Sequence, residues 1–352
     1  MNLRVDSYLQ ISGARMSAVR LQDVAELAGV SMKTVSNVVR GYQHVSQSTR
    51  DRVQRAIDEL DYRPNLMGRR LATGRTGLIA LSFSNVAIPY FAELSRLVSA
   101  AANQMGYRVL LEETDGTLEG ERAVLASFES GLVDGMLFQP AVVSSLEISR
   151  RRNSLPMVIL GEAAAPLTLD RIMVDNFAAA RDATNHLIRT GRRQIAFAGH
   201  ESGRLSAASS QRIMGYQQAL EDEGIPADPR LLFPRDTVTP MDAVIGVGAA
   251  VDAGIRFDGL VCRDDLAAIG ALRALQERGI SVPGDVALTG WDNIMMSRVT
   301  YPSITSVAPD TDALAHRATQ MLIERIEGWE GAGRHELVDH RLVLRESAPT
   351  HA

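Results

Sequence analysis

Residues 19–41 read VRLQDVAELAGVSMKTVSNVVRG, and this stretch decides how the first part of the chain folds. Its apolar residues recur with helical spacing through two short segments, which Gly29 separates. Ser31 stands where it can cap the second segment. We therefore predict one helix over 23–29 and a second over 31–40, joined by a tight turn. Such a helix-turn-helix presents its second helix to the major groove of DNA.

The faces of the second helix follow from the same spacing. We expect Val35 and Val39 to point inward, and the residues that remain on the outer face are Met32, Lys33, Ser36, Asn37 and Arg40. A third helix follows Ser46, a residue type that caps helices. Its apolar stripe is Val53, Ile57 and Leu60. The alternative is a small three-helix bundle with a solvated polar face and no DNA partner.

The charge of the chain is unevenly distributed. Residues 1–76 carry 12 Lys and Arg against 7 Asp and Glu, a net charge of +5. The remainder carries 25 against 35, a net of −10, which together give −5 for the chain. A basic head can bind phosphates, whereas an acidic body does not compete for them. The charge therefore favours the DNA-binding interpretation of the three helices.

A short linker follows at residues 64–76. Pro64 can begin a helix there and Gly74 can end it, whereas Gly68 inside it costs about 1 kcal/mol relative to alanine. A helix this short is marginal alone, so we expect residues 65–73 to be disordered in the free protein and helical on DNA. An ordinary linker is the alternative.

Three motifs now carry a family resemblance: DVAELAGVSMKTVSNVV, HVSQSTRDRV and YRPNLMGRRLATGRTG, which occur in this order. Residues 19–76 resemble the head and hinge of the LacI/GalR family of bacterial repressors, and a looser resemblance continues to about residue 347. It implies that Met32, Lys33 and Asn37 lie at base edges, where lysine suits guanine and asparagine suits adenine. The positions that it assigns to contacts with the DNA backbone are Leu21, Ser31, Thr34, Ser36, His44, Ser46 and Thr49.

The resemblance also implies a hinge helix that contains Asn65, Leu71 and Ala72. In the family, the leucine is wedged into the minor groove at the centre of the operator, and its partner in the second subunit does the same. Unstacking a base step has a cost, which contacts with the bent DNA offset. Asn37 stands where some members carry arginine, so their base preference does not transfer.

From residue 77 onward, apolar runs alternate with helical stretches. The expected strands are 78–83, 108–111, 135–138, 157–160, 194–199, 259–262 and 286–290. This alternation predicts an α/β body with parallel sheets, and its length favours two lobes. The resemblance implies a periplasmic-binding-protein-like body with chain crossings near 175, 307 and 336. Ligands of such sheets bind beyond the carboxyl ends of the strands.

Candidate effector-binding residues lie just after those strands. They are Tyr90, Phe91, Glu162, Arg212, Asp264 and Asp292. Arg212 matches the family arginine that grips effector hydroxyls or acidic groups, and Asp292 matches an aspartate that binds sugar hydroxyls. Asp264 and Ile88 stand where family members often have asparagine. Carboxylates and a guanidinium suit a polyol, and they also suit a nucleoside.

Each candidate has a structural alternative. Tyr90 or Phe91 can stack on a ligand ring, but either can equally belong to the core. Arg212 can form a surface salt bridge. Asp264 and Asp292 can cap helices. Trp291 is more often a packing residue than a ligand contact.

The expected organisation is an extension over 1–18 without order, a helix-turn-helix domain over 19–63, a hinge over 64–76 and an effector-binding and dimerisation domain over 77–352. The expected function is a repressor that binds double-stranded operator DNA as a homodimer and responds to a small molecule, a sugar or sugar derivative. The sequence shows no apolar run long enough to span a membrane and no signal peptide. It also shows no metal-binding spacing of His or Cys and no nucleotide-binding loop of the P-loop type. We therefore expect a cytoplasmic protein without cofactor or catalysis. The only cysteine, Cys262, fits a reducing compartment. The alternatives are a cytoplasmic small-molecule-binding protein and an α/β enzyme with a DNA-binding head.

Overall fold

The computed structural model describes residues 19–39, 42, 44–62, 75–150 and 155–350. Contacts divide the chain into two compact units, residues 1–76 and residues 77–352. The expected extension over 1–18 and the hinge residues 65–73 lie outside the described residues.

The described part of the first unit contains three helices: α1 (Leu21–Ala28), α2 (Met32–Val39) and α3 (Gln47–Glu59). Gly29 ends α1 with φ 63°, a left-handed conformation that suits glycine and makes the tight turn. The small core consists of Val24, Ala25, Ala28, Val35, Val38, Val53 and Ala56. The prediction that Val39 points inward is wrong, because its side chain is 40% exposed whereas Val38 is 7% exposed. The core closes around Val38, and Val39, the last residue of α2, lies outside it.

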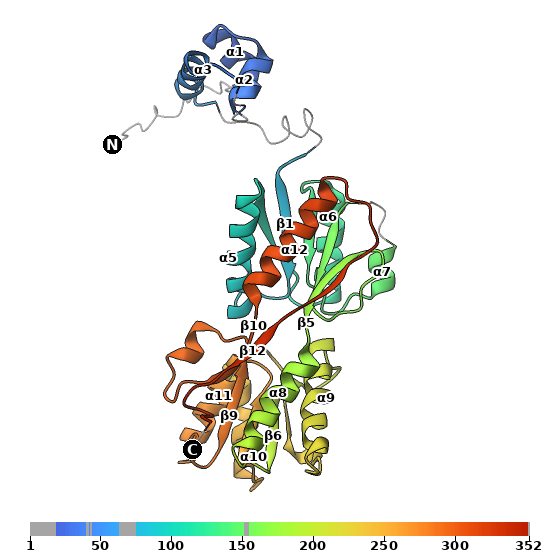
Figure 1. Ribbon diagram of the computed structural model, residues 1–352, viewed down its shortest axis with the longest axis vertical. Coiled ribbons are helices and arrows are strands. Elements are labelled where there is room, and N and C mark those ends of the chain that lie inside the picture. The colour runs from blue at the N-terminus through green and yellow to red at the C-terminus, as the bar shows by residue number, and fades with distance from the viewer. Residues whose placement is uncertain (1–18, 40–41, 43, 63–74, 151–154, 351–352) are drawn as a thin grey trace, which may run out of the picture. The chain divides into compact units, whose positions relative to one another are not determined.

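The second unit has two lobes, each built on a six-stranded sheet (Figure 1). The N-lobe sheet has the order β11-β5-β4-β3-β1-β2, and all its strand pairs are parallel. Its strands are β1 (Leu78–Phe83), β2 (Arg108–Glu113), β3 (Gly135–Phe138), β4 (Met157–Leu160), β5 (Asp170–Val174) and β11 (His335–Val338). Helices α5 (Pro89–Gln104) and α12 (Thr311–Ile326) pack on one face of this sheet. Helices α6 (Leu118–Glu129) and α7 (Ser145–Ser149) pack on the other.

The C-lobe sheet has the order β12-β10-β9-β8-β6-β7, in which only β10 and β12 pair antiparallel. Its strands are β6 (Ile195–Glu201), β7 (Leu232–Arg235), β8 (Gly259–Cys262), β9 (Ala287–Trp291), β10 (Thr305–Pro309) and β12 (His340–Val343). Helices α8 (Asn176–Arg189) and α9 (Ala207–Asp222) cover one face, and α10 (Pro240–Asp252) and α11 (Asp265–Gln276) cover the other. Two 3-10 turns, η1 (Pro229–Leu231) and η2 (Met295–Arg298), complete the lobe. The α/β fold class with a helix-turn-helix head and a two-lobed body is thereby confirmed.

Apolar runs do not predict five of the strands, β5, β7, β10, β11 and β12. In β10 the reason is chemical, because Thr305 and Ser306 are fully buried polar residues that hydrogen bonds satisfy. In β11 and β12 most residues are exposed or half-buried, since these strands lie at the edges of their sheets. Short edge strands lack the continuous apolar pattern of central parallel strands.

The chain passes between the lobes at residue 175 (β5 to α8), residue 310 (β10 to α12) and residue 339 (β11 to β12) (Figure 1). The expected positions were near 175, 307 and 336. One apolar cluster includes residues of both lobes, such as Leu81 of β1, Ala179 of α8 and Trp291 of β9. The lobes therefore share buried surface next to the crossings.

A buried carboxylate joins three separate segments of the N-lobe. Asp170, fully buried at the start of β5, accepts hydrogen bonds from the Arg325 side chain at 2.9 and 3.0 Å. It also accepts from the Arg334 backbone at 2.8 Å and from its side chain at 2.7 Å. Both guanidinium groups stack on Trp329, 4.1 Å from the ring centroid. Burial alone would raise the pKa of Asp170, but the hydrogen bonds from Arg325 and Arg334 lower it to about 2.

We expect Asp170→Asn to lower the free energy of unfolding by about 2 kcal/mol at neutral pH. The lowered pKa means that the folded state stabilises the ionised carboxylate, and an uncharged amide cannot provide this stabilisation. This contribution is present above about pH 4 and is lost as the pH falls towards 2. Urea unfolding of both proteins at pH 7 measures the difference. Asp222→Asn is the control, since Asp222 also pairs with an arginine, Arg181, but on the surface. Equal stability of the two variants would contradict the prediction.

Candidate functional site

The outer face of α2 carries the residues expected at base edges. Met32 is 53% exposed, Lys33 is exposed and Asn37 is half-buried, all on one helix whose opposite side packs in the core. Ser36 lies half-buried on the same helix. The structure therefore places these four side chains on one element of the size that a major groove admits.

The residues expected at the DNA backbone gather at two helix N-termini. The Ser31 hydroxyl accepts from the Thr34 backbone at 3.2 Å and contacts its hydroxyl at 2.9 Å. Ser46 caps α3 in the same way, through the Thr49 backbone. The N-terminus of a helix attracts anions, because its first N–H groups and the helix dipole point at the ligand. Both ends are thus suited to phosphates.

Two of the remaining head residues differ in their surroundings. Leu21 is half-buried and packs against the core of the three helices, which makes it a structural contact as well. His44 is exposed, and its ring lies edge-on to Tyr42 with 5.4 Å between centroids. Asn65, Leu71 and Ala72 lie outside the described residues.

In the body, the strand ends of both lobes bring Tyr90, Glu162, Arg212 and Asp292 together. Arg212 of α9 donates from Nε to Asn176 Oδ1 at 2.6 Å, and Asn176 donates from Nδ2 to Glu162 Oε1 at 2.5 Å. Glu162 belongs to the N-lobe and Arg212 to the C-lobe. Burial raises the pKa of Tyr90, and the nearby negative charges of Asp292 and Glu162 raise it further.

Asp264 is part of this region but is already engaged. It caps α11 by accepting from the Ala267 backbone at 2.8 Å. Its Oδ2 lies 2.9 Å from guanidinium nitrogens of both Arg235 and Arg263. Burial opposes ionisation, but these two positive charges outweigh it and lower the pKa of Asp264. Helix capping, the alternative raised for Asp264, is therefore what the structure shows, together with an ion cluster.

The aromatic side chains near the strand ends are mostly covered. Phe91 is 6% exposed and stacks on Phe83, with 5.1 Å between centroids and 6° between planes. Trp291 is 2% exposed, and the Arg212 guanidinium lies 3.8 Å from its ring centroid. The core alternative thus describes Phe91, and Trp291 is a packing residue. Tyr90 is half-buried, which leaves its ring as the aromatic candidate for a ligand contact.

Asp292 occupies a strained turn after β9. Its φ is 91° and that of Asn293 is 54°, conformations that non-glycine residues seldom adopt. The turn is held by the Asp265 carboxylate, which accepts from the Ile294 backbone at 2.8 Å and from the Ser306 hydroxyl at 2.7 Å. Burial raises the pKa of Asp292 to about 6, although Arg212 opposes the shift. Strain and a shifted pKa at one residue are typical of functional sites.

Several buried polar atoms at the same strand ends have no hydrogen-bond partner. Within the described residues they include Gln139 Oε1 and Ser82 Oγ in the N-lobe, and Glu201 Oε2, His200 Nε2 and Arg235 Nη2 in the C-lobe. Arg235 Nη1 is engaged in the ion pair with Asp264. Buried polar groups are nearly always paired, so each such atom requires an explanation. The set contains both donors and acceptors, and a ligand hydroxyl can pair with either kind.

Sequence reasoning missed Asn176, Arg235, Arg263, Glu201 and Gln139. Arg263 could have been found, since it directly precedes Asp264 after an expected strand. Arg235 lies at the end of β7, which the apolar pattern does not reveal. Asn176 follows a crossing, where only the tertiary structure shows which groups meet.

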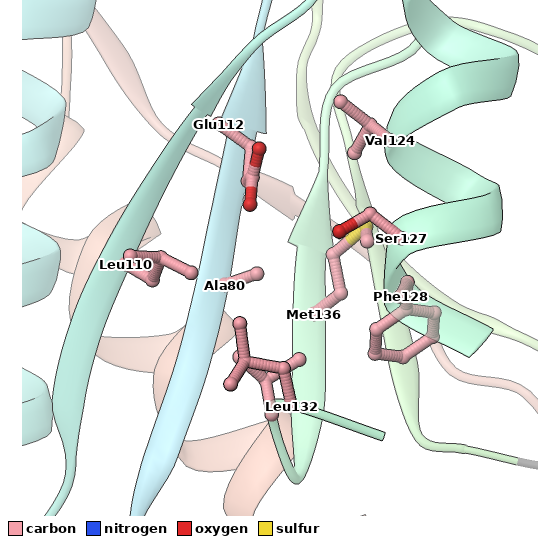
Figure 2. A pocket seen from close by; sticks show the side chains of 9 residues that line it. Ala80, Leu110, Glu112, Val124, Ser127, Phe128, Leu132 and Met136 are labelled. Atoms are coloured by element: carbon pink, nitrogen blue, oxygen red, sulfur yellow. The ribbon is translucent and has the colours of Figure 1, made fainter. Parts of the chain in front are cut away.

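Two hollows of the surface lie away from these residues. One is a crevice of about 10 Å³ between β1, β2, β3 and α6, lined by side chains such as Leu110, Met136 and Phe128 (Figure 2). This volume holds about one water molecule. The other is an open groove of about 480 Å³ beside the end of α9, lined by Gln217, Glu221, Gly224, Ile225, Pro226 and Ala227. Neither contains a residue expected to bind the effector.

Two features are absent from the described part of the chain. No group of three or more His, Cys, Asp or Glu residues in it could hold a metal ion. No helix in it is long and apolar enough to cross a membrane.

Comparisons with known proteins agree with this architecture. The model of bacterial regulatory proteins of the lacI family matches residues 20–65, and the model of the periplasmic binding protein-like domain matches residues 184–348. The HTH-type transcriptional regulator RegA of Clostridium saccharobutylicum is 31% identical over 94% of this chain and 99% of its own length.

Solved structures give the same result. The lac repressor dimer bound to operator and the anti-inducer ONPF has a TM-score of 0.83 at 25% identity, over 95% of this chain and 100% of that one. The complex of the transcriptional regulator CelR with cellobiose has a TM-score of 0.71 at 29% identity, over 94% and 99% of the two chains. The chain therefore belongs to the LacI family and is a transcriptional regulator with a helix-turn-helix head and a periplasmic-binding-protein-like body.

Proposed function

We propose that this regulator is a cytoplasmic repressor that binds a near-palindromic operator as a homodimer, and that a sugar or sugar derivative at the strand ends of its body switches it. The observation that carries the proposal is the set of polar side chains that both lobes contribute around Arg212. A ligand held by both lobes binds one arrangement of them better than another and so shifts the equilibrium between the two. These groups are mostly paired with one another, which suits binding rather than catalysis.

In this proposal the exposed face of α2 reads the operator. Lys33 donates to guanine, Asn37 pairs with adenine, and Met32 contacts a base edge. The N-termini of α2 and α3 hold phosphates through Ser31, Thr34, Ser46 and Thr49, while Leu21, Ser36 and His44 complete the backbone contacts. The hinge residues Asn65, Leu71 and Ala72 bind the minor groove.

We expect Lys33→Ala to weaken operator binding by about 1–3 kcal/mol and to relax the preference at one base pair of each half-site. The reason is the exposed position of Lys33 in the first turn of α2. Affinities for the operator and for random DNA, measured at one salt concentration, test it. An equal loss on both DNAs would show that Lys33 contacts only phosphate.

A sugar fits the body better than a nucleoside does. A nucleobase is commonly bound by stacking, but Phe83 covers Phe91 and Arg212 covers Trp291, which leaves Tyr90 as the one aromatic candidate of the three for such a contact. Hydroxyl groups, in contrast, donate to carboxylates such as Asp292 and accept from guanidinium groups. The CelR–cellobiose complex is a structural neighbour that holds a sugar. A thermal-shift screen of sugars and nucleosides on the purified protein tests this choice.

We expect Arg212→Ala and Asp292→Ala to abolish the response to the effector while operator binding persists. Both residues lie near the strand ends of the C-lobe. Burial shifts both pKa values: it lowers the pKa of Arg212 to about 10 and raises that of Asp292 to about 6. Calorimetry with the sugar found in the screen measures the loss. Arg181→Ala, which removes a surface arginine of the same lobe, is the control. Unchanged effector affinity in both variants would remove these residues from the site.

The homodimer is supported by an exposed apolar patch on the C-lobe. Met295, Val299 and Tyr301, in and beside η2, are 69%, 75% and 86% exposed. Neighbouring apolar side chains this exposed are typical of protein–protein contact sites.

We therefore expect Val299→Asp to weaken the dimer at least tenfold, because the interface would have to bury a carboxylate. Sedimentation equilibrium measures the dimer dissociation constant. Leu167→Asp is the control, since Leu167 is 82% exposed and lies in the N-lobe. Wild-type association of Val299→Asp would show that the patch is not the interface.

A further inference from the structure

Asn176 lies between the two groups that the proposed effector would use from opposite lobes. It is the first residue of α8, directly after the crossing at residue 175, and it is fully buried. Its Oδ1 accepts from Arg212 Nε at 2.6 Å. Its Nδ2 donates to Glu162 Oε1 at 2.5 Å and to the Val174 carbonyl at 3.1 Å. One amide therefore connects the C-lobe arginine with the N-lobe carboxylate.

The orientation of this amide is fixed by chemistry. A guanidinium only donates hydrogen bonds, whereas a carboxylate and a carbonyl only accept them. Nδ2 must therefore face Glu162 and Val174, and Oδ1 must face Arg212. An aspartate at this position could accept from Arg212 but would repel Glu162, and an apolar residue would serve neither.

The remaining atoms of the two partners point to a ligand role. Arg212 uses Nε on Asn176 and Nη1 on the Arg263 carbonyl, and Glu162 uses Oε1 on Asn176. In the described part of the chain, the other terminal nitrogen of Arg212 and the other carboxylate oxygen of Glu162 have no hydrogen bond of their own. They form a donor and an acceptor that a sugar diol can engage together.

We propose that Asn176 is a positioning residue of the effector site, which presents Arg212 and Glu162 to one ligand and links the two lobes while the site is empty. This role rests on the proposed function, because it assumes that an effector binds at these two side chains. Preorganising both groups lowers the cost of ordering them when the ligand binds. Breaking the hydrogen bonds of Asn176 to Arg212 and Glu162 should therefore let the two lobes move relative to one another even without ligand.

The test measures the distance between the lobes in the ligand-free protein. Spin labels on cysteines at Glu119 in the N-lobe and Glu223 in the C-lobe, both exposed, report this distance by pulsed electron resonance. The native Cys262 is 1% exposed and should not be labelled. Labelled full-length protein is mixed with an excess of unlabelled protein, so that each dimer carries one labelled subunit.

We expect Asn176→Asp to broaden the distance distribution and shift it to longer distances, because two carboxylates would face each other. The double variant Asn176→Asp with Glu162→Gln removes this repulsion and should shift the distribution back towards that of the wild type, although the donation to the Val174 carbonyl is still lost. In that variant, the carboxylate introduced at position 176 accepts both from Arg212 and from the amide introduced at position 162. Asn185→Asp makes the same chemical change at a half-buried position of the same helix and should have no effect. An unchanged distribution in Asn176→Asp, or no restoration in the double variant, would overturn the proposal.

A second pair of variants covers the case in which Asn176→Asp fails to fold. Glu162→Gln keeps an acceptor for Asn176 Nδ2 and should retain the wild-type distances, whereas Glu162→Leu should lengthen them. Identical distributions in these two variants would overturn the proposal. Since no ligand is present, these distances test the link between the lobes, whereas the sugar screen separately tests whether an effector binds at the two side chains.

Discussion

Burial of opposite charges at the carboxyl ends of the strands is the constraint on which this structure depends. An unpaired buried charge costs several kcal/mol, so each guanidinium near the strand ends requires a partner. Arg235 and Arg263 share Asp264, and Arg212 is held by Asn176 and the Arg263 carbonyl. The position where family members often carry asparagine is thus occupied here by an anchor for two arginines. In the proposed effector site, the groups left to meet a ligand are Arg212, Glu162 and Asp292.

The chain crossings turn this local constraint into a link between the lobes. Asn176 directly follows the crossing at residue 175, and the apolar cluster beside it includes residues of both sheets. Packed interiors resist continuous deformation, so a change at the strand ends favours a second discrete arrangement of the lobes over a gradual one. The strained turn at Asp292 lies in the same region, where Asp265 and Ser306 hold it. Under the proposed function, recognition and conformational change therefore involve the same few residues.

Sequence predicts best what depends on neighbours along the chain. The helix-turn-helix follows from helical spacing, Gly29 and Ser31, all within a short segment, and the central strands follow from apolar runs that both faces bury. Prediction from sequence fails where contacts between residues far apart in the chain determine the role of a residue. Thr305 and Ser306 are polar yet fully buried, because Asp265 and Ser347 satisfy them. Phe91 follows a strand as a ligand contact would, but Phe83 covers it. Asn176 has no distinguishing pattern, since its role depends on two partners from different lobes.

Charge also restricts how an effector could act on DNA binding. The body after residue 76 carries a net charge of −10, and the head carries +5. DNA affinity of such a head depends on phosphate contacts and therefore on the electric field around it. A neutral sugar leaves the charge of the body unchanged, so it cannot switch the protein by altering that field. Control must then pass through the geometry of the lobes. The contacts between the lobes, above all Glu162–Asn176–Arg212, are therefore the part of the body where substitutions should change switching.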